Sequence, residues 1–215
     1  MSDETTQAEE QDLELRASID RSLRIPLLFF FTSAAAWLFV AAILGIFSSL
    51  KLYAPAILDD CAIFDYGRIY PAHNNALVYG WAMQAGFGVA LWLMARLSRQ
   101  ALRGFGIILV AGHIWNLAIS VGILSVLFGW GQSMVWLDFP SFIWPIMLIA
   151  YTGIVIWMLG LFVTRRNPDA YISQWYLLAS LFWFPWVFIT TNAMIHEMDT
   201  AAVTKTVVSG WYVSN

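Results

Sequence analysis

The chain of 215 residues is 60% hydrophobic and only 12% charged, and its mean hydropathy is +0.68. This composition lies far outside the range of soluble domains and indicates an integral membrane protein. The net charge of −3 comes mostly from acidic residues among the first twenty, and a basic, nucleic-acid-binding surface is excluded. The single cysteine, Cys61, excludes an internal disulfide and a thiolate metal cage.

The acidic segment at residues 1–24 precedes the membrane domain that we expect at residues 25–215. It has neither the basic start nor the small-residue cleavage site of a signal peptide, so we expect the first span to remain in the mature protein. Leu13, Ile19 and Leu23 stand among charged residues in the second half of this segment. That pattern leaves two alternatives open, an interfacial helix and a solvated tail.

Five apolar runs are long enough to cross about 30 Å of hydrocarbon, which takes about 20 helical residues. They are Pro26–Ser49, Pro71–Leu97, Phe105–Trp130, Phe139–Thr164 and Tyr171–Ile195. A sixth run opens near Val203 and is too short to span. Because spans in lipid must satisfy their own backbone, the sequence predicts an all-α fold, a polytopic membrane helix bundle of five transmembrane helices plus the start of a sixth. Pro145 and Pro185 lie inside the runs, where neighbouring groups must satisfy the carbonyls that they free.

The basic residues fall almost entirely on one side of these spans. That side carries Arg16, Arg21, Arg24, Arg96, Arg99, Arg103, Arg165 and Arg166. The other side receives only Lys51, Arg68 and Lys205. The positive-inside rule therefore predicts a cytoplasmic N-terminus, and it places His73 at the external face, at the start of a helix that runs inward.

His73 stands two residues after Pro71, where an aqueous loop passes into the second span. The helical period puts Ala76, Leu77, Gly80 and Gln84 on the same face. This small, mostly apolar stripe gives room for a flat macrocycle bound by His73. The alternative is that the small residues allow close helix packing and that the histidine faces water at the interface.

The motif Tyr-Gly-Arg-x-x-Pro-x-His-x-Asn-Ala at Tyr66–Ala76 resembles the opening of the second transmembrane helix in catalytic subunit I of the haem-copper oxidases, particularly the cbb-type branch. Gln84 stands where that branch has Asn. Weaker likenesses occur at Gly131-Gln132-Ser133, at Asp138-Phe139-Pro140, at Arg165-Arg166 with Tyr171-Ile172 and Trp175, and at residues 210–215. The resemblance runs from Tyr66 onward and would cover somewhat less than half of a full-length subunit.

The resemblance implies that His73 is one axial ligand of a low-spin haem b, whose iron passes electrons without binding oxygen because both axial positions are filled. It implies that Arg68 lies near the haem propionates, the alternative being a solvated loop arginine. It further implies a multi-pass protein of the bacterial inner membrane. The implied partners are the lipid bilayer, other respiratory complex subunits, a cytochrome c-type electron donor and the remainder of subunit I.

Two positions depart from the family pattern. Ser214 stands where the family has a histidine that binds copper, and a hydroxyl is a poor substitute. Tyr70 replaces an arginine. Asp138 resembles an acidic residue of the external loop, and no metal is assigned to it. The other ligands of the family's metal centres belong to helices outside this chain, so we expect it to contribute to oxygen reduction only in an intact complex and to bind no copper itself.

Two further histidines could act as ligands. His113 lies about ten residues into the third span, and we expect it to bond to a neighbouring helix, through Asn116 or Ser120. His196 ends the fifth span at the level of His73. This leaves two alternative functions: a small membrane cytochrome b or haem-binding accessory subunit that uses His73 and His196, and a membrane scaffold without a cofactor.

Overall fold

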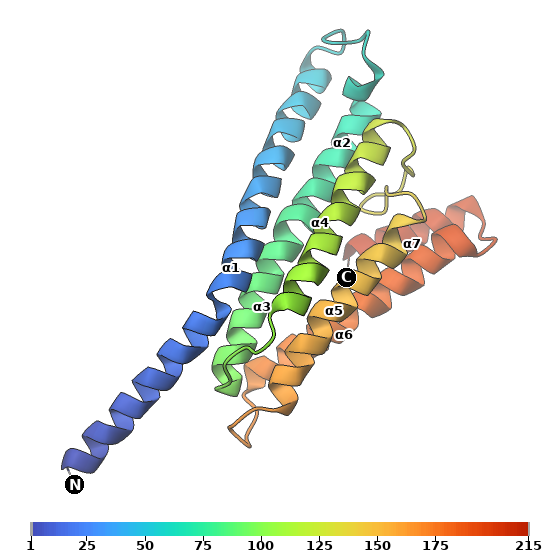
Figure 1. Cartoon of the computed structure of the whole chain (residues 1–215). Helices are drawn as coiled ribbons and strands as arrows, with labels where there is room; N and C mark the ends of the chain where they lie inside the picture. The colour runs from blue at the N-terminus through green and yellow to red at the C-terminus, as the bar shows by residue number, and fades with distance from the viewer. Residues whose placement is uncertain (1, 215) are drawn as a thin grey trace.

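The computed structural model describes residues 2–214, and no side chains at residues 2–5 and 8. Asn215, the last residue of the motif at 210–215, lies outside the described residues. Within them the chain is helical and has no strand, which confirms the all-α fold class (Figure 1). The elements are α1 (Ser2–Tyr53), η1 (Ala62–Phe64), α2 (Tyr66–Asn75), η2 (Ala76–Ala82), α3 (Met83–Ser98), α4 (Gly106–Leu127), α5 (Ile143–Val163), α6 (Ile172–Asn192), η3 (Ala193–Glu197) and α7 (Ala202–Ser214).

Among the described residues, 5 helices are long and apolar enough to cross a membrane. They cover Glu9–Tyr53, Tyr66–Ser98, Gly106–Leu127, Ile143–Val163 and Ile172–Glu197. Each predicted span falls on one of them, which confirms the prediction of a polytopic bundle. The sixth run forms α7, which has only 13 residues.

The acidic N-terminal segment belongs to α1, a single helix of 52 residues. Ile19 and Leu23 are buried, and the hydroxyl of Ser22 accepts a hydrogen bond from the amide of Leu102, between α3 and α4. Around Ile19 and Leu23 the segment is therefore a packed helix, whereas Leu13 is exposed. Pro26 lies inside α1, which changes direction along its length (Figure 1); a proline removes one backbone donor and is an ordinary cause of such a bend.

The second span is one continuous rod of α2, η2 and α3, in which η2 is a π-helical segment. The amide of Met83 donates to the carbonyl of Val78, five residues earlier, where an α-helix would bond four residues back. Hydropathy gave no sign of this segment, because its residues are as apolar as those of an ordinary helical span. Such turns occur often at functional sites, and this one begins three residues after His73.

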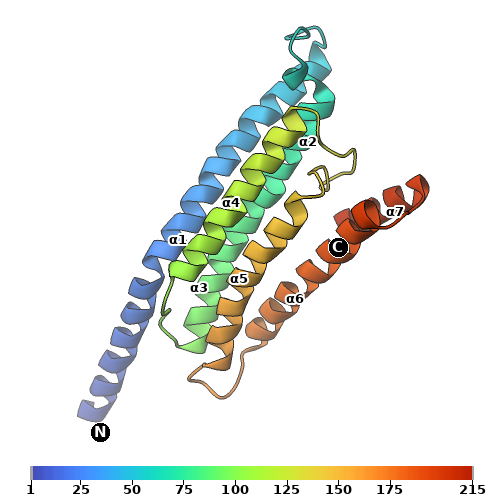
Figure 2. The same cartoon turned by 45° about the vertical axis from the view of Figure 1, so that its right-hand side comes forward.

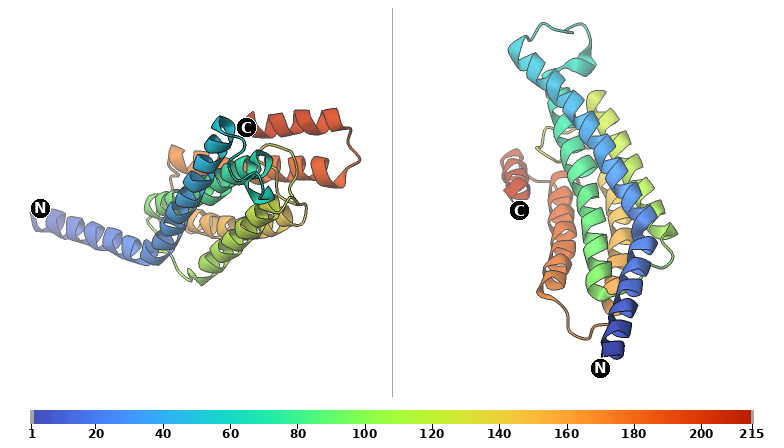
Figure 3. Two further views of the ribbon diagram at one scale, coloured as in Figure 1. Left: turned by 90° about the horizontal axis from the view of Figure 1, so that it is seen from above. Right: turned by 90° about the vertical axis from the view of Figure 1, so that its left-hand side faces the viewer.

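α1, the α2–α3 rod, α4 and α5 pack together, whereas α6 diverges from α5 along its length (Figure 2). α6 contacts α3 and α5, and α7 turns back beside it (Figure 3). The arrangement puts the start of α2, with His73, and the end of α3, with its arginines, at opposite ends of the bundle.

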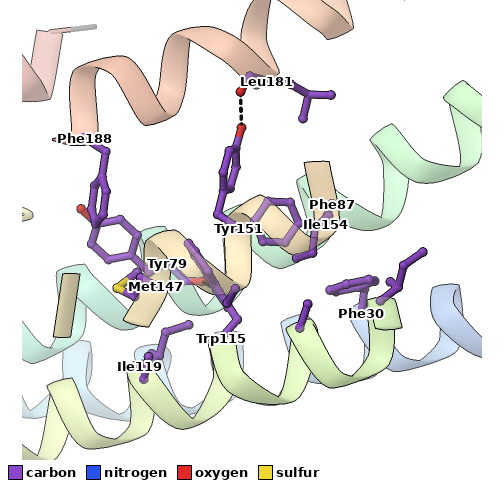
Figure 4. Packing of buried hydrophobic residues seen from close by; sticks show 14 of the residues in the cluster. Phe30, Tyr79, Phe87, Trp115, Ile119, Met147, Tyr151, Ile154, Leu181 and Phe188 are labelled. Atoms are coloured by element: carbon purple, nitrogen blue, oxygen red, sulfur yellow. Dashed lines mark hydrogen bonds between the residues drawn. The ribbon is translucent and has the colours of Figure 1, made fainter. Parts of the chain in front are cut away.

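Aromatic side chains from several helices fill the core, and ten core residues are labelled in Figure 4. The hydroxyl of Tyr151 on α5 donates to the carbonyl oxygen of Leu181 on α6, at 2.8 Å. Leu181 lies four residues before Pro185, which cannot supply the usual amide donor. The predicted compensation is thus provided by a tyrosine on the neighbouring helix. Pro145 needs none, because it lies in the first turn of α5, where amides have no helical partner.

Candidate functional site

His73 is held by a backbone group of α1. Its Nδ1 lies 2.7 Å from the carbonyl oxygen of Ala41. A carbonyl oxygen only accepts hydrogen bonds, so Nδ1 carries the proton and the neutral ring keeps a lone pair on Nε2. Among the described residues no hydrogen bond reaches Nε2. This is the tautomer and anchoring that a metal-binding histidine uses.

An open groove of about 550 Å³ lies beside the imidazole. Its lining consists of His73 and residues of α1: Ala42, Gly45, Ile46, Ser49, Leu50 and Tyr53. The volume falls in the range of about 300–1,000 Å³ that is common for ligand sites. The hydroxyl of Ser49 donates to the carbonyl of Gly45, which leaves a mostly apolar wall. These residues fit one axial ligand of a haem and an apolar surface beside it.

Glycines let α1 and the second span approach closely at this site. A Cβ atom at Gly45 would lie 2.9 Å from Cε1 of His73, and one at Gly80 would lie 2.7 Å from Cγ of Trp37. Ala76 is fully buried. Part of the small-residue stripe therefore accommodates α1, as the close-packing alternative expects, while the groove remains beside His73 itself.

Arg68 lies against the end of α4. Its Nη1 donates to the carbonyl oxygen of Leu127 at 3.2 Å, and its Nε lies 4.0 Å from Oδ2 of Asp65. This contact satisfies one of the carbonyls left free at a helix C-terminus. His73 instead contacts α1, so the structure does not bring Arg68 and His73 together, and the propionate role of Arg68 stays a prediction.

Asp138 is buried in the loop between α4 and α5. Its Oδ2 accepts a hydrogen bond from Nδ2 of Asn75, at 2.6 Å. Burial raises the pKa of Asp138 to about 6, although the bond from Asn75 lowers it in part. A cavity of about 250 Å³ lies beside this pair, with Tyr70 and Pro71 in its lining. The partnership was missed in the sequence because the two residues are 63 positions apart.

Tyr79, inside η2, links the second span to α7. Its hydroxyl donates to the carbonyl oxygen of Trp136 at 2.6 Å, so the hydroxyl of Tyr212, at 2.8 Å, must donate to Tyr79. Both tyrosines are buried. Sequence reasoning missed this pair. Ser214, at the end of α7, donates to the carbonyl of Gly210.

His196 lies on η3, which packs against α6 and α7, whereas His73 contacts α1. The structure therefore does not bring the two histidines together. Nε2 of His196 is buried and has no hydrogen-bond partner among the described residues. Within residues 2–214, no group of three or more His, Cys, Asp or Glu residues could hold a metal ion.

The expectation for His113 is wrong. Its Nδ1 bonds to the carbonyl of Leu109 in its own helix, and the exposed ring lies against Phe29 of α1, with ring centres 4.6 Å apart and ring planes 32° apart. The helical period alone does not fix which face of a span meets its neighbours.

The polar link between helices is made by Asn116 instead, which is partly buried. Its amide exchanges two hydrogen bonds with Gln84 of α3, at 3.0 and 3.1 Å, and its oxygen accepts a third from Trp37 of α1 at 2.7 Å. This network joins three spans. Its signal in the sequence was the presence of two amides inside apolar runs.

Comparison with known proteins gives a consistent result. The model of the family described as cytochrome c and quinol oxidase polypeptide I matches residues 25–214. The chain is 24% identical over 167 residues to a cytochrome c oxidase subunit 1 homolog of Agrobacterium tumefaciens (strain T37), covering 78% of this chain and 29% of the relative.

It is 24% identical over 172 residues to cytochrome c oxidase subunit 1 of Rhodobacter capsulatus, covering 78% of this chain and 30% of the relative. It is also 22% identical over 178 residues to the cbb3-type cytochrome c oxidase subunit CcoN1 of Stutzerimonas stutzeri, covering 81% and 35% respectively. The chain thus spans about a third of the length of the curated relatives that it matches.

Proposed function

Because this chain belongs to the cytochrome c and quinol oxidase polypeptide I family, we propose that it carries electrons in a respiratory oxidase of the membrane, through a low-spin haem b whose iron is bound by His73. Three relatives named as cytochrome c oxidase subunits, one of them cbb3-type, support this proposal. Five helices capable of spanning the membrane are consistent with it.

The hydrogen bond between Nδ1 of His73 and the carbonyl of Ala41 is the observation that carries the proposal. It fixes the ring orientation, raises the basicity of Nε2 and leaves that atom free for iron. Gly45 supports the arrangement, since its missing side chain leaves room for the ring.

The haem would supply reversible uptake of one electron at its iron. The chain would orient the imidazole through Ala41, and the apolar wall of α1 would lower the local dielectric, which is one of the ways in which a protein adjusts a reduction potential. Arg68 receives no task in this proposal while its guanidinium is bound at the end of α4.

The proposal extends to the setting of the protein. A cytochrome c-type donor would deliver electrons, and other respiratory subunits would complete the complex. The remainder of subunit I would supply the second haem ligand and the site of oxygen reduction. The arginine distribution favours a cytoplasmic N-terminus in a bacterial inner membrane. We assign no copper to this chain, because Ser214 offers a hydroxyl where the family has an imidazole.

Titration of the purified full chain with haem in detergent tests the proposal. We expect a Soret band with a high-spin spectrum, because the second axial ligand lies outside this chain, and we expect His73→Ala to abolish it. His113→Ala is the matched control, because it removes an exposed histidine from a neighbouring span and should leave the spectrum unchanged. A Soret band that survives His73→Ala would refute the assignment, and the absence of any band in the unaltered chain would favour the cofactor-free scaffold.

A second candidate function is a self-contained membrane cytochrome b with His73 and His196 as its ligands. The buried, unpartnered Nε2 of His196 favours it, although η3 would have to approach α1. In this case His196→Ala should change a low-spin spectrum to a high-spin one. Under the first proposal the same variant leaves the spectrum as it is.

A further inference from the structure

A cavity of about 200 Å³ lies at the end of the bundle opposite His73, between α1, the end of α3 and the start of α6. Three arginines line it, namely Arg16, Arg96 and Arg99. The same lining contains Asp12, Tyr171 and three apolar side chains. Nothing in the proposed electron-transfer function uses this cavity.

Cationic groups outnumber the carboxylates that face them here. Asp12 is shared between Arg16, at 2.7 Å, and Arg99, at 2.5 Å. Arg96 pairs with Asp20 at 2.6 Å. Three guanidinium groups therefore share two carboxylates as ion-pair partners.

Arg96 also has an unused donor. Its Nε is buried and has no hydrogen-bond partner among the described residues. Its guanidinium lies over the ring of Trp92, 5.7 Å from the ring centre. This contact positions the guanidinium but gives its Nε–H no acceptor. A buried cationic donor without an acceptor is costly and calls for an anion nearby.

The apolar part of the lining lies at the end of a span. Leu15, Ile19 and Leu97 contribute to it, and the candidate membrane span of the second helix ends at Ser98. A cationic rim above an apolar floor, at the boundary of the hydrocarbon, matches a phospholipid, with the phosphate against the arginines and the glycerol against the leucines. We propose that this cavity binds the phosphate group of an anionic phospholipid, with Arg16, Arg96 and Arg99 as its partners.

The same ion pairs could serve only to hold the N-terminal part of α1 against α3. Two variants distinguish this structural role from phospholipid binding. Arg16→Gln combined with Arg99→Gln removes the anion-binding groups, whereas Asp12→Asn frees both arginines. Both variants break the same ion pairs, so a structural role alone predicts the same effect for each. Lipid binding predicts opposite effects.

Native mass spectrometry of the full chain in detergent, titrated with phosphatidylglycerol, phosphatidylcholine or inorganic phosphate, supplies the measurement. We expect the unaltered chain to prefer phosphatidylglycerol, the double arginine variant to bind it about tenfold more weakly, and Asp12→Asn to bind it more tightly. Arg21→Gln combined with Arg103→Gln is the control, since it removes the same charge from exposed positions at the same end.

Several results would overturn the proposal. The first is equal affinity of the unaltered chain for phosphatidylglycerol and phosphatidylcholine. The second is a loss of affinity in the Arg21/Arg103 control as large as that in the Arg16/Arg99 variant. Weaker lipid binding by Asp12→Asn, or displacement of the lipid by inorganic phosphate at a similar concentration, would also overturn it. Helix content measured by circular dichroism identifies a variant that has failed to fold, and the Asp12→Asn result then decides the question alone.

Discussion

Asn75 and Asp138 meet inside the protein, where Nδ2 of Asn75 donates to Oδ2 of Asp138 across 2.6 Å. The bond joins α2 to the loop between α4 and α5. Because burial raises the pKa of this carboxyl to about 6 from 3.8, the folded protein holds, at a pH between these two values, a proton that the unfolded chain has already released. Protonation of Asp138 is thereby coupled to the packing of this loop.

That coupling predicts a pH dependence with a definite sign. The raised pKa of Asp138 means that its proton stabilises the fold, fully so below about pH 4. This stabilisation is lost as the pH rises through about 6, which lowers the free energy of unfolding by about 2–3 kcal/mol. Asp138→Asn should remove the dependence, so the variant gains stability relative to the unaltered chain between pH 4.5 and 7. Thermal unfolding in detergent at both pH values measures it. Asp60→Asn, at an exposed position, should show no such gain, and parallel curves for all three proteins would contradict the prediction.

The hydrogen bond from Tyr151 to Leu181 should contribute more to stability when residue 185 is a proline, which removes the usual amide donor, than when it is an alanine. Tyr151→Phe is expected to lower the free energy of unfolding by about 1–3 kcal/mol, because it leaves a buried carbonyl without a partner. In a Pro185→Ala background the restored amide can serve Leu181, and the same substitution should cost less. A cost that is equal in both backgrounds, measured by thermal unfolding, would show that the hydroxyl does not compensate for the proline. Tyr176→Phe, at an exposed position of the same helix pair, is the control.

Gly45→Ala should displace His73 without altering it chemically. The added Cβ would lie 2.9 Å from Cε1 of the imidazole, so the ring must move and its bond to Ala41 must stretch, at a cost of about 1–3 kcal/mol. We expect weaker haem binding and a lower melting temperature. Gly86→Ala is a matched control, since no heavy atom lies within 4 Å of its added Cβ. Unchanged haem affinity in Gly45→Ala would mean that the position of the ring does not matter for the ligand.

The amide pair of Gln84 and Asn116 should show strong coupling. Replacing either residue by Leu leaves the amide of the other with unmet hydrogen bonds and should lower the free energy of unfolding by about 0.6–2 kcal/mol in a membrane setting. The double replacement should cost less than the sum, because both polar groups are then gone. Thermal unfolding of the four proteins in one detergent gives the coupling energy. Additive costs would indicate that the two amides act independently.

The five spans could be predicted because the requirement for about 20 apolar residues acts on each segment separately. The bend at Pro26 and the need for compensation near Pro185 also follow from single residues. The residue that compensates for Pro185 could not be predicted, since Tyr151 lies 30 positions from Leu181. Only tertiary packing brings the two together.

The candidate site was predictable to a similar extent. His73 could be selected from its motif and its place at the end of a membrane span. Its hydrogen-bond partner could not be predicted, because the carbonyl of Ala41 belongs to another helix. The expectation for His113 was wrong because an apolar run of this kind has no polar face from which to judge orientation. Asn75, Tyr79 and Tyr212 carry buried hydrogen bonds that depend on the loop before α5, and no local pattern specifies where such a loop folds back.

The π turn between α2 and α3 sets the direction in which His73 points around the axis of the second span, relative to Gln84. One residue more than an α-helix needs is accommodated in η2, and each residue of an α-helix advances the chain by 100°. Deleting one residue between Ala76 and Ala82 would let the rod become regular, and the part of the rod that carries His73 would turn by about that angle relative to Gln84. His73 would then swing away from Ala41 while the length and hydropathy of the span hardly changed. The histidine's direction is therefore encoded by the count of residues between it and Gln84 as much as by its own identity.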